Sequence, residues 1–116
     1  MAEETSIREK TTEPILFQVL SDGNIVDLTG VNHIEMHMID AKGKVYRYAS
    51  NATGTPAVVI ANAGLGQVNF TPPNETIFKY TRTPYRLYIE VFDTATEHYT
   101  VPEAGEENII NVRKEF

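Results

Sequence analysis

The sequence predicts an all-β protein, an antiparallel immunoglobulin-like β-sandwich of about seven to eight strands with one short helical turn. Three observations support this prediction. Apolar and polar residues alternate with a period of two in short runs rich in β-branched and aromatic residues. Clusters of Gly, Pro, Asn and Asp separate these runs at intervals of about 8 to 14 residues. No segment between them has the periodicity of a long amphipathic helix.

The composition limits the size of the protein and the classes of partner. The 116 residues, 41% of them apolar, suit one domain that buries roughly two thirds of its unfolded surface. The absence of cysteine excludes disulfides, thiolate zinc sites and a cysteine nucleophile. Ten Lys and Arg against sixteen Asp and Glu give a formal charge of −6, which disfavours nucleic acid and anionic membrane surfaces as partners. Without a signal peptide or an apolar run of about 20 residues, the chain is expected to be soluble and unexported.

The chain is expected to divide into a flexible N-terminal arm, residues 1–13, and a single β-sandwich domain, residues 14–116. The arm is charged and rich in Thr, and Ile7 is its only sizeable aliphatic residue. Such a composition does not offset the entropy lost on ordering. Order is expected to begin at Pro14, before the alternating run 15–20.

Two long runs predict the clearest core faces of the sheets. The alternation in residues 33–38 and 85–92 is typical of half-buried strands. The side chains expected to share one interior are Ile34, Met36, Met38, Leu87, Ile89 and Val91. Further strands are expected over residues 15–20, 44–49, 58–60, 67–70, 98–101 and 108–112. The short helical turn is expected over residues 74–79, where Asn74 can act as the N-cap.

The pattern His33-x-Glu35-x-His37 places three metal-capable side chains on one face of a strand. Residues two apart on a strand lie about 6.6 Å apart and can share an ion, but His33 and His37 lie about 13 Å apart and cannot. A third ligand would have to come from another strand. The simpler interpretation is a solvated or partner-facing side of the strand, so no metal and no cofactor are predicted.

The sequence nominates no catalytic residue, and the protein is not expected to be an enzyme. Ser6, Ser21 and Ser50 lie in the arm, a turn and a loop without a nucleophile-elbow motif, and only His98 remains as a distant base. A triad assembled in space from distant segments stays an alternative.

The second face of the strand over residues 85–92 predicts a protein interface. Arg86, Tyr88 and Phe92 stand on that face, and Arg, Tyr and Phe are enriched at the centres of interfaces. The alternative is that the arm or a loop of the same chain covers the two rings, since large exposed apolar patches are uncommon in monomers.

Several segments, taken in chain order, resemble the N-terminal domain of baseplate upper proteins and related tail proteins of bacteriophages. The resemblance rests on ILFQVLSDG, DLTG, DAKG, GQVNFTP, YRLYIEVFD and VPEAGEENIINV, which together span Ile15 to Val112. Members of that family continue into coiled or receptor-linked segments, whereas this chain ends at Phe116. A stand-alone tail component and a piece of a longer protein therefore both stay open.

The resemblance implies an immunoglobulin-type sandwich and a role as a phage virion structural protein. It implies a tail or baseplate assembly module, located in the virion after assembly in the host cytoplasm. The expected partners are other phage tail or baseplate proteins and, further, copies of the same chain. The alternative function is a carbohydrate-binding or adhesin-type domain for host recognition, which the absence of Trp disfavours.

Overall fold

The chain forms an all-β structure, which confirms the all-β part of the predicted fold. The computed structural model describes residues 3–21, 23–94, 96–101 and 108–114. Within these ranges the regular elements are strands, apart from two short 3₁₀ turns, η1 (Ala63–Leu65) and η2 (Tyr80–Arg82). The strands form one six-stranded sheet, one three-stranded sheet and one small two-stranded sheet.

The six-stranded sheet is built around one long central strand. Its members are β1 (Glu3–Arg8), β5 (His33–Ile39), β6 (Val45–Ala49), β9 (Tyr85–Phe92), β10 (His98–Val101) and β11 (Asn108–Arg113). The order is β1-β11-β9-β5-β6, with β10 also paired to β9. One edge of β9 pairs with β5, and its other edge is shared by β10 and β11. Every pairing in this sheet is antiparallel except that of β1 with β11, which is parallel.

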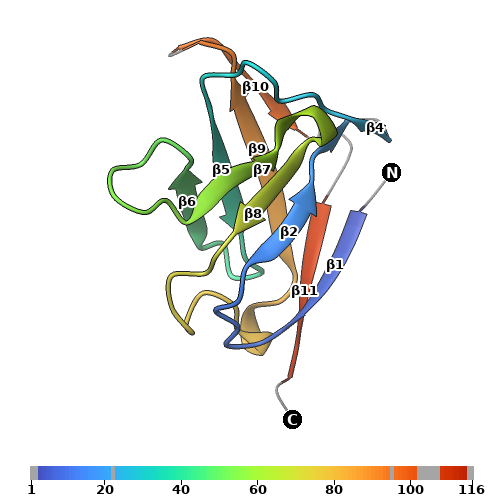
Figure 1. Cartoon of the computed structure of the whole chain (residues 1–116). Coiled ribbons are helices and arrows are strands. Elements are labelled where there is room, and N and C mark those ends of the chain that lie inside the picture. Colours follow the sequence, from blue (N-terminus) through green and yellow to red (C-terminus); the bar gives the residue numbers. More distant parts are fainter. Residues whose placement is uncertain (1–2, 22, 95, 102–107, 115–116) are drawn as a thin grey trace.

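The three-stranded sheet forms a second layer. It has the order β2-β8-β7 and consists of β2 (Ile15–Gln18), β7 (Val58–Asn62) and β8 (Gln67–Phe70). In Figure 1 this sheet lies in front of β5 and β9. The small sheet is a hairpin of β3 (Leu20–Ser21) and β4 (Asn24–Ile25).

The core lies between the two larger sheets, and the six predicted core residues are buried. Ile34, Met36, Met38 and Val91 are 0% exposed, and Leu87 and Ile89 are no more than 4% exposed. The three-stranded sheet contributes the buried side chains of Phe17, Val58, Val68 and Phe70. Burial of such a side chain stabilises the fold by roughly 1.5 to 3 kcal/mol. The period-two pattern therefore assigned the inward faces of β5 and β9 correctly.

The prediction of a flexible arm is wrong for the described residues 3–8, which form β1. This strand pairs in parallel with β11 over its whole length, and Ile7 lies opposite Val112. Ile7 is only 9% exposed, and the backbone NH of Glu9 donates to the Arg113 carbonyl at 2.9 Å. Because β11 presents an edge with hydrogen-bonding groups to satisfy, pairing supplies the stabilisation that the arm's composition lacks.

The predicted helical turn over residues 74–79 is also wrong. The Asn74 side chain does accept a hydrogen bond from the backbone NH of Thr76, at 2.9 Å, but no helix follows this turn. Instead Ile77 and Phe78 are drawn into the core, at 8% and 0% exposure. Local capping therefore gives way to burial of two large apolar side chains in consecutive positions.

A buried carboxylate fastens the turn between β5 and β6 to η2. Asp40 is 4% exposed and accepts hydrogen bonds from the backbone NH groups of Lys42 and Lys44, the Tyr46 hydroxyl and the Arg82 guanidinium, at 2.9 to 3.0 Å. Burial alone would raise the pKa of Asp40, but these hydrogen bonds together hold it below its ordinary value. Burial, followed by the hydrogen bond to Asp40, raises the pKa of Tyr46.

Candidate functional site

The three predicted interface residues lie on the outward-facing positions of β9. Arg86 is exposed, whereas Tyr88 and Phe92 are half-buried. Because alternate residues of a strand share a face, the three side chains stand on the outer side of the six-stranded sheet, away from the core.

The ring of Phe92 is covered on both sides by histidines of the same chain. His33 on β5 and His98 on β10 both lie opposite Phe92 in the strand register. Their imidazole rings stack on the phenyl ring with centroid distances of 4.2 and 4.6 Å. The alternative expected from the sequence is that the arm or a loop covers this ring. The residues that cover it lie instead on two neighbouring strands. The ring faces of Phe92 are therefore not available for a flat contact with a partner.

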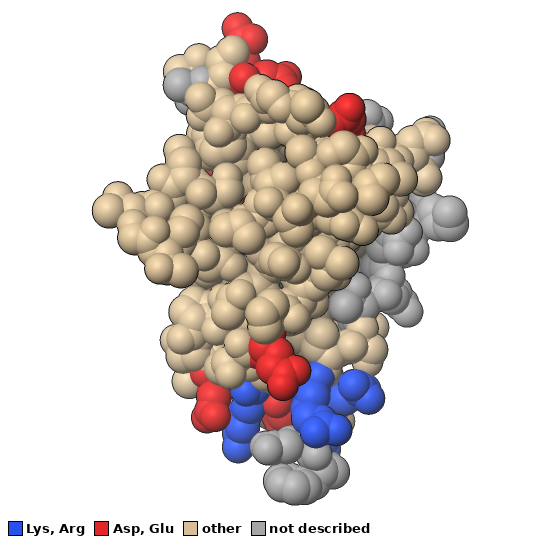
Figure 2. Space-filling view, viewed as in Figure 1, with Lys and Arg blue, Asp and Glu red and all other residues tan. Residues whose placement is uncertain are grey.

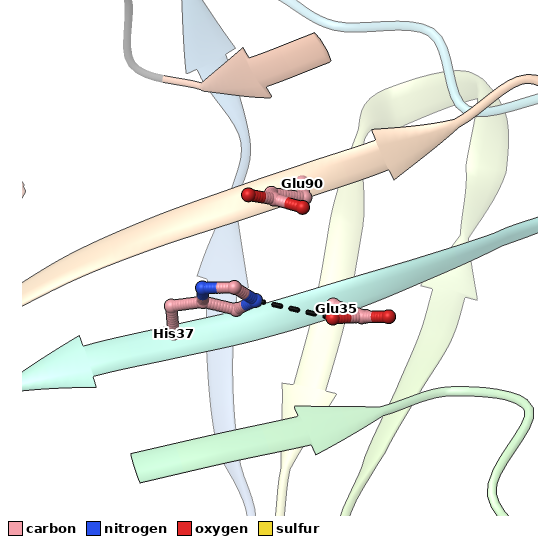
Figure 3. Close-up of side chains that lie close together, drawn as sticks. All are labelled: Glu35, His37 and Glu90. Atoms are coloured by element: carbon pink, nitrogen blue, oxygen red, sulfur yellow. Dashed lines mark hydrogen bonds and ion pairs between the residues drawn. The ribbon is translucent and has the colours of Figure 1, made fainter. Parts of the chain in front are cut away.

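Two glutamates face each other in the next position along the same strands. Glu35 on β5 lies directly opposite Glu90 on β9, and His37 follows two residues after Glu35. His37 Nε2 lies 3.2 Å from Glu35 Oε1, and one ligand atom from each of the three residues lies within 4.8 Å of the others. Figure 3 shows the three side chains together on the two neighbouring strands.

All three histidines of the chain contact this pair of glutamates. His33 Nε2 lies 3.8 Å from Glu35 Oε2, and His98 Nε2 lies 3.6 Å from Glu90 Oε2. We call these five residues, His33, Glu35, His37, Glu90 and His98, the histidine–glutamate cluster.

The second face of β5, predicted to be solvated or partner-facing, is only partly open to water. His33 is only 7% exposed, and the side chains of His37 and Glu35 are 17% and 29% exposed. β5 lies between β6 and β9, so neighbouring strands flank its outward side chains on both sides. The sequence analysis required a third metal ligand from another strand without identifying it. Glu90 occupies that place, and only the register between β5 and β9 reveals it.

The arrangement favours cation binding over nucleophilic catalysis. Among the described residues, Glu35, His37 and Glu90 form the group close enough to hold a metal ion. Ser50, one of the serines considered as a nucleophile, instead accepts a hydrogen bond from the backbone NH of Ile34 at 3.0 Å. His98 contacts Glu90 and stacks on Phe92. These contacts give both side chains structural partners.

A second candidate region is the outer side of the three-stranded sheet. We call the outward residues of β2, β7 and β8, namely Leu16, Gln18, Val59, Gln67 and Asn69, the uncharged face. Leu16 is 56% exposed and Val59 is 40% exposed, and both lie opposite Asn69 in the register. Residues 48–74 contain no Asp, Glu, Lys or Arg. Figure 2 shows the result, with charged residues at the two ends of this view and a broad uncharged surface between them.

No family model matches the chain, and no curated protein sequence matches it. In the described part of the chain, no helix is long and apolar enough to cross a membrane. The structure thus defines an all-β protein with two candidate functional regions, the histidine–glutamate cluster and the uncharged face.

Proposed function

We propose that the protein is a structural component of a bacteriophage tail or baseplate that acts through protein–protein contacts. In this proposal its location is the virion, its partners are other tail or baseplate proteins or copies of itself, and it carries out no catalysis. The segments between Ile15 and Val112 that resemble phage baseplate proteins support the phage assignment. The uncharged face supports the contact function.

The uncharged face is the single observation that carries the proposal. Charged residues make up 22% of the chain, yet none lies in β2, β7 or β8. Exposed Leu16 and Val59 stand on either side of Asn69, and Leu65 in η1 is 46% exposed. Interfaces are depleted in charge at their centres, and exposed apolar side chains gathered on one face mark interaction sites.

We further propose that the two layers form an immunoglobulin-type sandwich. The Tyr85 hydroxyl, at the start of β9, donates to the Ile77 carbonyl at 2.8 Å and accepts from the Lys79 backbone NH at 2.9 Å. A tyrosine at the start of a strand that bonds back to the upstream backbone is typical of immunoglobulin-like corners. This feature supports the finer fold assignment.

Arg86 and Tyr88 form a second proposed contact on the opposite layer. They are the members of the predicted interface whose side chains the histidine stack does not enclose, and Arg86 is exposed. Phe92 acts in this proposal as the support for the two imidazoles.

The test introduces charge into the uncharged face. Leu16→Glu and Val59→Glu are combined, and association is measured by sedimentation velocity, with the wild type alone and mixed with proteins encoded by neighbouring genes. We expect the wild type to form oligomers or a complex and the double variant to lose at least tenfold in affinity. Ile25→Glu is the matched control, because Ile25 is 48% exposed on β4 of the small hairpin, outside both proposed contacts. A Tyr88→Ser variant tests the second contact in the same assay.

Two results would count against the proposal. One is a wild-type protein that stays monomeric and binds none of these partners. The other is full association of the double variant with an intact circular dichroism spectrum.

The alternative proposal is a carbohydrate-binding or adhesin domain. Its structural support is two exposed rings, Tyr80 and Tyr99, each 41% exposed. They lie on η2 and β10, which adjoin opposite ends of β9, so the two rings do not form one platform for a sugar. A glycan array with no signal at high protein concentration would dismiss this alternative.

A further inference from the structure

We propose that Glu35, His37 and Glu90 bind one divalent transition-metal ion of the zinc class on the outer face of the six-stranded sheet. The ion would join the two central strands, β5 and β9. This inference goes beyond the proposed assembly function and does not depend on it.

The distances already suit a shared ion. Two ligands bound at about 2.0 to 2.1 Å in tetrahedral geometry stand about 3.3 to 3.4 Å apart. His37 Nε2 and Glu35 Oε1 are 3.2 Å apart, and one oxygen of Glu90 completes a set within 4.8 Å. A movement of the Glu90 carboxylate oxygen by at most about 1.5 Å brings the third ligand to bonding distance, and such a movement is accessible because terminal carboxylate torsions are broad.

The charges favour a cation at this point. Glu35 and Glu90 are paired residues of adjacent antiparallel strands, and like charges in such positions destabilise a sheet. Both side chains are partly withdrawn from water, which weakens the screening of their repulsion. A divalent ion cancels the two negative charges, and the formal charge of −6 on the chain favours the approach of cations.

The surrounding residues hold the ligands in place. His98 lies 3.6 Å from Glu90 and His33 lies 3.8 Å from Glu35, so each carboxylate has a second imidazole beside it. Both of these imidazoles are fixed by stacking on Phe92. Groups that orient the ligands of a metal in this way commonly change its affinity by 10- to 100-fold.

The donor set selects the class of ion. Imidazole and carboxylate together suit Zn²⁺, Ni²⁺ and Co²⁺, whereas Ca²⁺ requires six to eight oxygen ligands. Three protein ligands leave at least one coordination position for water.

The test measures Zn²⁺ binding by isothermal titration calorimetry on the full chain, together with thermal unfolding with and without Zn²⁺. We expect one ion per chain and a higher unfolding temperature with Zn²⁺. Glu90→Gln and His37→Gln should each weaken binding at least tenfold. Glu75→Gln, at an exposed glutamate outside the cluster, is the matched control and should bind like the wild type.

Thermal unfolding gives a second readout that does not require the variants to bind anything. Glu90→Gln removes the repulsion with Glu35, so without metal it should unfold at the same temperature as the wild type or above it. With Zn²⁺ the order should reverse, because only the wild type gains stability from the ion. The imidazole ¹⁵N resonance of His37 Nε2 should also shift on addition of Zn²⁺.

Three outcomes would overturn the proposal. The first is that the wild type binds none of Zn²⁺, Ni²⁺ and Co²⁺ at about 1 mM metal, a concentration well above the dissociation constants of functional sites. The second is binding that Glu90→Gln and His37→Gln leave unchanged, which would place the ion elsewhere. The third is a His37 resonance that does not respond while Zn²⁺ binds.

Discussion

Replacing Asp40 by alanine removes a carboxylate that joins three parts of the fold. Its four hydrogen-bond donors come from the turn after β5, from β6 and from η2. Because the carboxylate is buried and charged, its bonds are stronger than neutral bonds at the surface. We therefore expect Asp40→Ala to be among the most destabilising single changes outside the apolar core.

The magnitude follows from what each donor can do afterwards. The Tyr46 hydroxyl is left in a residue that is only 7% exposed, and losing its charged partner costs about 1.5 kcal/mol. Arg82, with a side chain that is 30% exposed, can turn to water and loses about 1 kcal/mol. The two backbone NH groups belong to exposed residues and lose about 0.5 kcal/mol between them. The sum is about 3 kcal/mol.

Urea unfolding followed by circular dichroism measures this loss. With a slope of about 1.5 kcal/mol per molar, typical of a small domain, the midpoint should fall by about 2 M urea. Glu75→Ala, at an exposed position, is the control and should change stability by less than about 0.5 kcal/mol. A loss of less than about 1 kcal/mol for Asp40→Ala would refute the reasoning.

The same carboxylate predicts a dependence on pH. The pKa of Asp40 is held below its ordinary value of 3.8 in the folded protein. A lowered pKa means that its contribution is fully present above about pH 5 and is lost as the pH falls through the folded-state pKa. The stability difference between the wild type and Asp40→Ala should therefore be constant near pH 7 and shrink below about pH 4. A difference that stays constant down to pH 2 would contradict this assignment.

Three further changes test other parts of the fold by the same unfolding assay. Tyr85→Phe should lower the free energy of unfolding by about 1 to 2 kcal/mol, because the buried Ile77 carbonyl loses its hydrogen-bond donor. An unchanged midpoint would show that this hydrogen bond does not stabilise the fold. Gly66→Ala should cost about 2 kcal/mol or more, since Gly66 has φ +62° and a Cβ there would lie 2.4 Å from the Val26 carbonyl oxygen; a neutral substitution would disprove that contact. Ile7→Ala should cost about 2 kcal/mol if β1 packs as described, and nothing if the arm is free.

The alternation of apolar and polar residues predicted the strands whose buried face is set by their own sequence. The period of two in residues 33–38 and 85–92 was sufficient to assign the buried faces of β5 and β9. The pattern could not predict β1, because this strand pairs with β11, about 105 positions away in the sequence. The stability of such a pairing depends on backbone hydrogen bonds to a distant strand, which the composition of residues 3–8 does not reveal. Sequence distance also explains why the helical turn predicted over residues 74–79 was wrong. The core that buries Phe78 is built by strands that lie elsewhere in the sequence.

The sequence predicted which residues of the candidate site share a strand face, but not which residues of neighbouring strands lie opposite one another. The sequence placed His33, Glu35 and His37 on one face and Tyr88 and Phe92 on another strand's outward face. It did not give the register that sets Glu35 against Glu90 and both stacked histidines against Phe92. A shift of one residue would turn Glu90 inward, so the site exists only in this register.

The two candidate regions lie on opposite outer sides of the molecule, which makes their functions separable. Glu35 and Glu90 point outward from the six-stranded sheet, while Leu16 and Val59 point outward from the three-stranded sheet. The core, with Met36 at 0% exposure, lies between them, and two packed sheets stand about 10 Å apart. A partner seated on the uncharged face would therefore leave the metal ligands accessible. It follows that Glu90→Gln should not weaken association through the uncharged face, and Leu16→Glu should not weaken Zn²⁺ binding. A partner held by Arg86 and Tyr88 would instead lie beside Glu90 on the same face.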